Sequence, residues 1–142
     1  MKSTTTSRRS LLAVPATSPR FLEKAAQSPA DAVFIDLEDA VIASLKPRAR
    51  TDAIAAINQL DWGRRSVAVR VNGLTTSWGC RDILDVVEAC PRLDCILLPK
   101  CESPADVHAV EVMIRSAGSN KVWEDSSVPT ADDLYRTAPV TK

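Results

Sequence analysis

Several residue types that mark particular classes of site are scarce in this sequence. Its 142 residues include one histidine, His108, so a Ser–His–Asp triad or a zinc site is nearly excluded. Cys80, Cys90, Cys95 and Cys101 form no C-x-x-C pair and no metal-finger spacing, and we expect reduced thiols. The four glycines form neither the dinucleotide-binding pattern nor the P-loop pattern.

An excess of charge of one sign is also lacking. The 18 basic and 18 acidic side chains cancel, so no overall field favours nucleic acid or an anionic membrane. The three tryptophans form no stacking stripe, and no apolar run approaches the roughly 18 residues that span a bilayer. Residues 1–8 are polar and lack the apolar core of a secretory signal. We therefore expect a disordered arm there and a cytoplasmic protein that binds neither nucleic acid nor membrane.

Short apolar runs alternate with amphipathic stretches between residues 9 and 115. This alternation predicts an α/β domain with a parallel sheet covered by helices, followed by an irregular tail over 116–142. Two architectures fit four such units, an open doubly wound sheet or half of a (β/α)8 barrel, and the pattern does not decide between them. The expected strands are 11–15, 32–37, 67–71 and 96–99, and the expected helices are 19–27, 47–60, 83–89 and 104–114.

Polar side chains alternate with apolar ones along the second and third expected strands. The odd-numbered positions 33–37 and 67–71 are apolar and should pack under helices. Asp36, Glu38, Arg70 and Asn72 should then share the opposite face, near the carboxyl ends of neighbouring strands. In a barrel that face is the lumen, and active sites form at its carboxyl-terminal rim.

Two interpretations of this polar group remain open, and both can hold at once. Arg70 can form an ion pair with Asp36 or Glu38 that closes the top of the core. Alternatively, Arg70 can offer its planar fork of donors to a substrate carboxylate or carbonyl, with the acids orienting it or a metal's water shell. Lys100, at the end of the fourth strand, is equally open to a structural or a functional interpretation.

The turn after the first strand leads into a helix that carries two cations on one face. Arg20 and Lys24, together with free N–H groups at the start of this helix, could hold a phosphate. Solvated surface charges fit these two residues equally well.

Five segments, in order, carry a resemblance to a known family. The chain resembles the citrate lyase β-subunit and malyl-CoA lyase family of the aldolase/citrate lyase superfamily, over roughly residues 8–114. The segments are RRSLLAVP at 8–15, DAVFIDLEDAV at 31–41, VRVNG at 69–73, SWG at 77–79 with Asp82, and LLPKCES at 97–103.

The resemblance implies the first four units of a (β/α)8 barrel, a magnesium-dependent family and an acyl-CoA substrate handled by aldol-type chemistry. It also implies a substrate contact at Arg70 and, as in some members, CoA contacts at Arg20 and Lys24. Asp36, Glu38 and Asn72 would support them. Ala13 departs from the family, since many relatives carry a larger aromatic side chain there.

The family's magnesium ligands, a Glu and an Asp on later strands, have no matching segment in this chain. We therefore assign neither a metal ligand nor a catalytic residue, and Glu124, Asp125, Asp132 and Asp133 are not taken as ligands. The function expected from the resemblance is a carbon–carbon lyase acting on an acyl-CoA such as citryl-CoA or malyl-CoA. The alternatives are a truncated, non-catalytic fragment or partner-binding module, or an unrelated open α/β domain. Open strand edges would favour homo-oligomers or other association.

Overall fold

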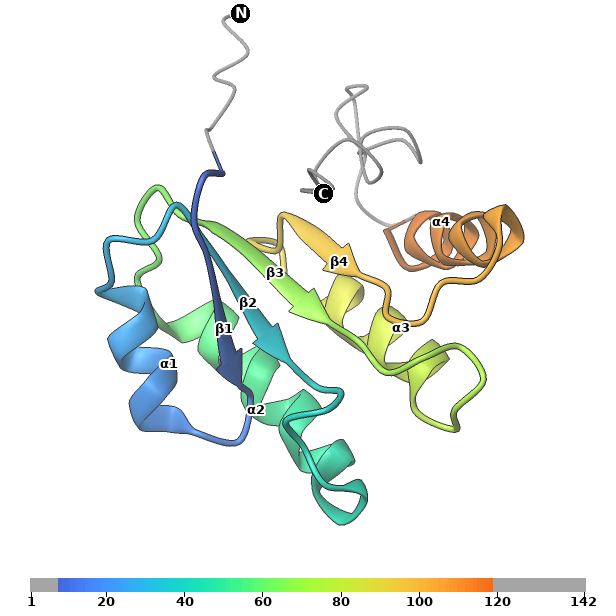
Figure 1. Ribbon diagram of the computed structural model, residues 1–142, viewed down its shortest axis with the longest axis horizontal. Coiled ribbons are helices and arrows are strands. Elements are labelled where there is room, and N and C mark those ends of the chain that lie inside the picture. Colours follow the sequence, from blue (N-terminus) through green and yellow to red (C-terminus); the bar gives the residue numbers. More distant parts are fainter. Residues whose placement is uncertain (1–7, 119–142) are drawn as a thin grey trace, which may run out of the picture.

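The structure is a computed structural model that describes residues 8–118 (Figure 1). The expected arm and tail lie outside the described residues, except for Arg8 and residues 116–118. Four parallel strands form one sheet in the order β1-β2-β3-β4. They are β1 Leu11–Pro15, β2 Ala32–Asp36, β3 Ser66–Arg70 and β4 Cys95–Leu97, and the helices are α1 Pro19–Ala26, η1 Ala43–Leu45, α2 Lys46–Gln59, α3 Gly79–Ala89 and α4 Pro104–Gly118.

The strand order of the described part of the chain bears on the choice between the two architectures. A doubly wound sheet needs a point at which the strand order reverses, and these four strands follow one another without reversal. Right-handed crossovers then place the connecting helices on the same side of the sheet. Figure 1 shows α2 and α3 behind the sheet, α1 beside β1, and α4 beside α3. The α/β class with a parallel sheet is confirmed, and closure into a barrel stays a prediction.

The core lies between the sheet and these helices. The row formed by Val14, Ile35, Val69 and Ile96 is buried across all four strands, in agreement with the expected alternation. Ala53 and Ile57 of α2 and Ile83 and Val86 of α3 are also buried. On the opposite face Ala13 is exposed and Phe34 is half-buried. No helix of the described region is long and apolar enough to cross a membrane.

Several element ends differ from the sequence prediction. Helix α3 begins at Gly79 rather than 83, because the Thr76 hydroxyl accepts the N–H of Gly79 (3.2 Å) at the helix start. Helix α4 continues past 114 to Gly118. Strands β2 and β3 each end one residue early, at Asp36 and Arg70. This last difference changes the position of Asn72.

Candidate functional site

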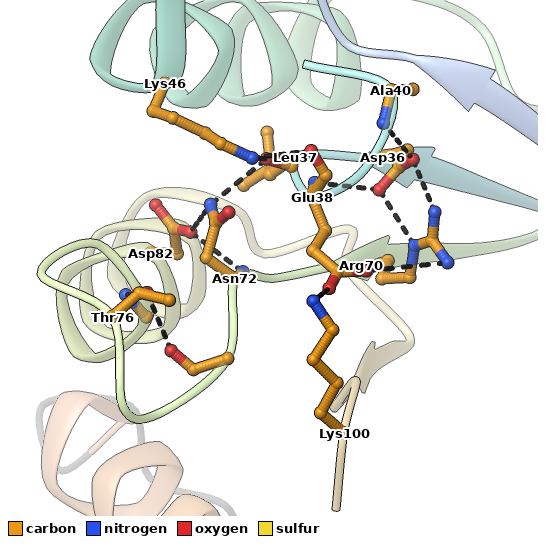
Figure 2. A network of polar contacts seen from close by, with 12 residues as sticks. Asp36, Leu37, Glu38, Ala40, Lys46, Arg70, Asn72, Thr76, Asp82 and Lys100 are labelled. Atoms are coloured by element: carbon orange, nitrogen blue, oxygen red, sulfur yellow. Dashed lines mark hydrogen bonds and ion pairs between the residues drawn. The ribbon is translucent and has the colours of Figure 1, made fainter. Parts of the chain in front are cut away.

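A bidentate ion pair joins neighbouring strands at the carboxyl end of the sheet. Asp36 and Arg70 are partners in the β2–β3 register. Arg70 Nε donates to Asp36 Oδ1 (2.9 Å) and Nη2 donates to Oδ2 (2.6 Å), which is a fork-to-fork contact (Figure 2). The guanidinium also lies 5.5 Å from the centre of the Phe34 ring. The ion pair expected from strand alternation is present, and Arg70 is held in one orientation.

Asp36 has further hydrogen-bond partners besides Arg70. It accepts the N–H groups of Glu38 (2.8 Å) and Ala40 (3.1 Å) in the loop after β2. Burial acts to raise the pKa of Asp36, but the bonds from Arg70, Glu38 and Ala40 outweigh it and hold the pKa below the ordinary value. Asp36 therefore stays ionised and fixes both Arg70 and the start of the loop.

Glu38 lies between two cations. Its Oε2 is 3.6 Å from Arg70 Nη1, and its Oε1 is 2.8 Å from Lys100 Nζ, as Figure 2 shows. The Glu38 side chain is buried, whereas that of Lys100 is 71% exposed. The adjacent Glu38 carboxylate raises the pKa of Lys100, so the ammonium stays charged. Lys100 thus joins Asp36, Glu38 and Arg70 in a four-residue cluster, which we call the rim cluster.

Asn72 does not belong to the rim cluster, contrary to the sequence prediction. Its side chain donates to the Leu37 carbonyl (3.1 Å) and to Asp82 Oδ2 (2.6 Å), and its backbone N–H also donates to Asp82 (3.1 Å). The alternation of faces holds only within a strand, and β3 ends at Arg70. Asn72 lies in the following loop, where its side chain is turned towards α3.

A buried polar network supports the rim cluster from the helix side. Lys46 of α2 donates to the carbonyl oxygens of Leu37 (2.8 Å) and Glu38. Asp82 of α3, which has no exposed surface, accepts Arg50 Nε (2.8 Å) as well as both Asn72 donors. Burial lowers the pKa of Lys46, partly offset by the neighbouring carboxylates. The two loops that follow β2 and β3 are therefore tied to α2 and α3.

The sequence analysis missed Lys46 and Arg50 and mentioned Asp82 only as part of a motif. A signal was available, because buried faces of helices repeat every three or four residues. Lys46 and Arg50 are spaced four apart, in line with the buried Ala53 and Ile57. Asp82 falls in the same way between the buried Gly79 and Val86. A charge inside an apolar stripe indicates a buried polar network.

Arg20 and Lys24 are both exposed on α1. Within residues 8–118 neither side chain takes part in a hydrogen bond or ion pair, so both are available to a ligand, and their CoA role stays a prediction. His108 lies on the exposed surface of α4, 3.7 Å from Glu111.

The described carboxylates do not fit a magnesium site. Residues 8–118 contain no group of three or more His, Cys, Asp or Glu side chains placed to hold a metal ion. Asp36 and Glu38, the acids nearest the strand ends, are paired with Arg70 and Lys100. Magnesium prefers several free oxygen ligands in octahedral geometry, which these paired acids do not offer.

Known proteins are similar to this chain in sequence and in fold. The L-malyl-CoA/beta-methylmalyl-CoA lyase of Cereibacter sphaeroides is 46% identical over 101 residues, which are 70% of this chain and 32% of that protein. A (3S)-malyl-CoA thioesterase of the same species is 42% identical over 106 residues, 75% of this chain and 36% of that protein. The chain thus spans about a third of the length of these curated relatives.

A solved structure and a family model agree with these relatives. The structure of CitE from Mycobacterium tuberculosis superposes with a TM-score of 0.59 at 33% identity, over 72% of this chain and 44% of that one. The sequence model of HpcH/HpaI aldolase/citrate lyase matches residues 9–127, which include the whole rim cluster. The expected family is thereby confirmed, and the chain belongs to the HpcH/HpaI aldolase/citrate lyase family.

Proposed function

We propose that this chain provides one part of the active site of a carbon–carbon lyase for acyl-CoA esters of the malyl-CoA or citryl-CoA type. The observation that carries the proposal is the Asp36–Arg70 pair, held at the carboxyl ends of parallel strands inside the region matched by the family. The curated lyase relatives supply the reaction class and the CoA ester. The remaining barrel strands and the catalytic acid or base are proposed to come from outside the described residues.

Arg70 is suited to hold an oxygen-rich substrate. Asp36 occupies Nε and Nη2, whereas the one contact of Nη1 among residues 8–118 is with Glu38, at 3.6 Å. A substrate carboxylate or carbonyl oxygen can bind at Nη1 while Asp36 keeps the guanidinium plane in place. Fixed donors of this kind position the bound fragment without reorganising during the reaction.

In the proposed cleavage, the proton of the substrate hydroxyl leaves and the adjacent carbon–carbon bond breaks. The bonding electron pair moves to the carbon next to the thioester carbonyl, and the resulting enolate is protonated to give the shorter acyl-CoA. Arg70 holds the fragment that becomes the carbonyl product. Arg20 and Lys24 are proposed to contact the CoA phosphates.

A second candidate is hydrolysis of the same thioester, and the malyl-CoA thioesterase relative favours it. The two reactions give different products from malyl-CoA. Carbon–carbon cleavage releases glyoxylate and acetyl-CoA, whereas hydrolysis releases malate and the free CoA thiol. Assays for glyoxylate and for free thiol therefore separate them.

A chimera tests the proposal. Residues 9–115 would replace the matching segment of the Cereibacter sphaeroides lyase, and both products would be followed with malyl-CoA. We expect glyoxylate, and we expect Arg70→Lys to lower kcat/KM by roughly thirtyfold, about 2 kcal/mol, since lysine keeps the charge but loses the fork. The melting temperature should change little.

Two other outcomes would contradict the lyase proposal. A folded chimera that releases only free thiol would favour the thioesterase, and one that releases neither product would favour a non-catalytic module. An Arg70→Lys chimera with a much lower melting temperature and unchanged kcat/KM would show that Arg70 has only a structural role.

A further inference from the structure

Lys100 has an uncommon backbone conformation. Its φ of +51° lies in the left-handed region, and it is the only non-glycine residue with positive φ among residues 8–118. A side chain with a Cβ atom is disfavoured there, and such residues concentrate at functional sites where the surroundings hold them. Lys100 follows β4 at the same sheet edge as Arg70.

Glu38 is held much more loosely than Asp36. Asp36 accepts four hydrogen bonds, two from Arg70 and two from backbone N–H groups. Glu38 Oε1 lies 2.8 Å from Lys100 Nζ but accepts no aligned hydrogen bond within the described region. Its other oxygen is 3.6 Å from Arg70 Nη1, beyond hydrogen-bonding distance. One buried carboxylate therefore faces two cations, with a close ion pair to the exposed Lys100 and a longer contact with Arg70.

We propose that Lys100 is a second ligand-binding cation beside Arg70, and that Glu38 is an internal counter-ion which a bound carboxylate replaces. The ligand class is a short dicarboxylate or 2-oxo acid, small enough to contact Arg70 Nη1 and Lys100 Nζ together. That this ligand is part of a CoA-ester substrate rests on the proposed function. The binding of the anion itself is independent of the proposed function.

The charges of the rim cluster support this assignment. Asp36 and Arg70 neutralise each other through two short bonds, so Glu38 and Lys100 form the exchangeable pair. An incoming carboxylate repels Glu38 and offers Lys100 an equivalent partner. The Lys100 side chain is 71% exposed, so its ammonium is reachable and free to follow the ligand. A dianion should therefore bind more tightly than a monoanion.

Malonate, with acetate as the monoanion, is a suitable probe for the full 142-residue chain. Isothermal titration would give the Kd, and the Arg70 Nε–H resonance would report where the ligand binds. Lys100→Gln should raise the malonate Kd about tenfold, the order expected for one charge-assisted contact. Glu38→Gln should lower it about fivefold, because the competing anion is removed.

Lys100→Gly separates a binding role from a structural one. Glycine tolerates positive φ, so Lys100→Gly should have a higher melting temperature than Lys100→Gln while losing malonate affinity to the same extent. A purely structural ion pair predicts that both variants lower the melting temperature and leave the malonate Kd unchanged. Arg48→Gln is the control, since Arg48 is an exposed cation of α2 that pairs with Asp52, and its malonate Kd should equal that of the unchanged chain.

The proposal is wrong if malonate fails to saturate the unchanged chain, if Lys100→Gln binds it equally well, or if Glu38→Gln binds it more weakly. The chimera distinguishes this inference from the proposed function. Malonate binding that depends on Lys100, with no glyoxylate from the chimera, would refute the lyase assignment alone. Glyoxylate formation with malonate binding indifferent to Lys100 would refute this inference alone.

Discussion

Replacing Asp82 by asparagine removes one charge from the buried network while keeping the shape of the side chain. Asp82 Oδ1 accepts Arg50 Nε (2.8 Å), and Oδ2 accepts the side chain and backbone of Asn72 (2.6 and 3.1 Å). In Asp82→Asn, an NH2 group must face one of these donors, so a buried donor loses its acceptor. Arg50 also loses its fully buried counter-ion.

The cost follows from the exposure of the remaining partners. Removing one member of a buried ion pair costs about 3–5 kcal/mol. Arg50 keeps its second contact with Asp85 (2.9 Å), which is partly exposed, so we expect the lower end, about 3 kcal/mol. Asp52→Asn is the matched control, because its partner Arg48 is exposed, and it should cost less than about 0.5 kcal/mol.

Urea unfolding followed by circular dichroism gives the free energy of unfolding for each variant. A double-mutant cycle with Arg50→Met should show a coupling energy of about 2 kcal/mol, since the two residues share one network. A loss below about 1 kcal/mol for Asp82→Asn, or single effects that simply add, would refute the view that Asp82 joins the two loops.

Three further outcomes are expected. Gly79→Ala should destabilise the fold by roughly 1–3 kcal/mol in urea unfolding, because the new Cβ would lie 2.4 Å from the Gly73 carbonyl oxygen, and no loss would mean that the loop moves freely. Because the pKa of Asp36 is lowered on folding, its contribution to stability is present above about pH 4, near the unfolded value, and is lost as the pH falls through the folded value. The difference in unfolding free energy between the unchanged chain and Asp36→Asn should therefore shrink below pH 4, and a constant difference would contradict this ionisation. The purified chain alone should release no glyoxylate from malyl-CoA with magnesium or with a chelator, and turnover abolished by the chelator would show that its own carboxylates, or those of a second copy, bind the metal.

Much of the fold could be read from the sequence because its signals are local. The apolar odd-numbered positions of two strands identified the buried face, and register then brought Asp36 beside Arg70. The same reasoning failed for Asn72, because it assumed that the strand continued past Arg70. Strand ends depend on where hydrogen-bonding partners stop, which is a property of the neighbouring strand.

The buried polar network of Lys46, Arg50, Asn72 and Asp82 was harder to predict because its partners come from separate helices. Arg50 and Asp82 are 32 residues apart and meet only when α2 and α3 pack together. Lys100, which pairs with Glu38, likewise has a positive φ, a conformation normally associated with glycine. A lysine at this position does not predict that conformation.

The buried polar network and the exposed face of the sheet lie on different sides of the strands, and this has a consequence for how new ligand preferences can arise. Lys46, Asn72 and Asp82 brace the loops from one side of the sheet, whereas Ala13, on the edge strand, is exposed on the other side next to Phe34 in register. Enlarging Ala13 adds volume on the exposed face of the sheet, next to Phe34, without disturbing a buried polar contact. Under the proposed function, a directed-evolution library confined to position 13 can therefore vary this face at little cost in folding.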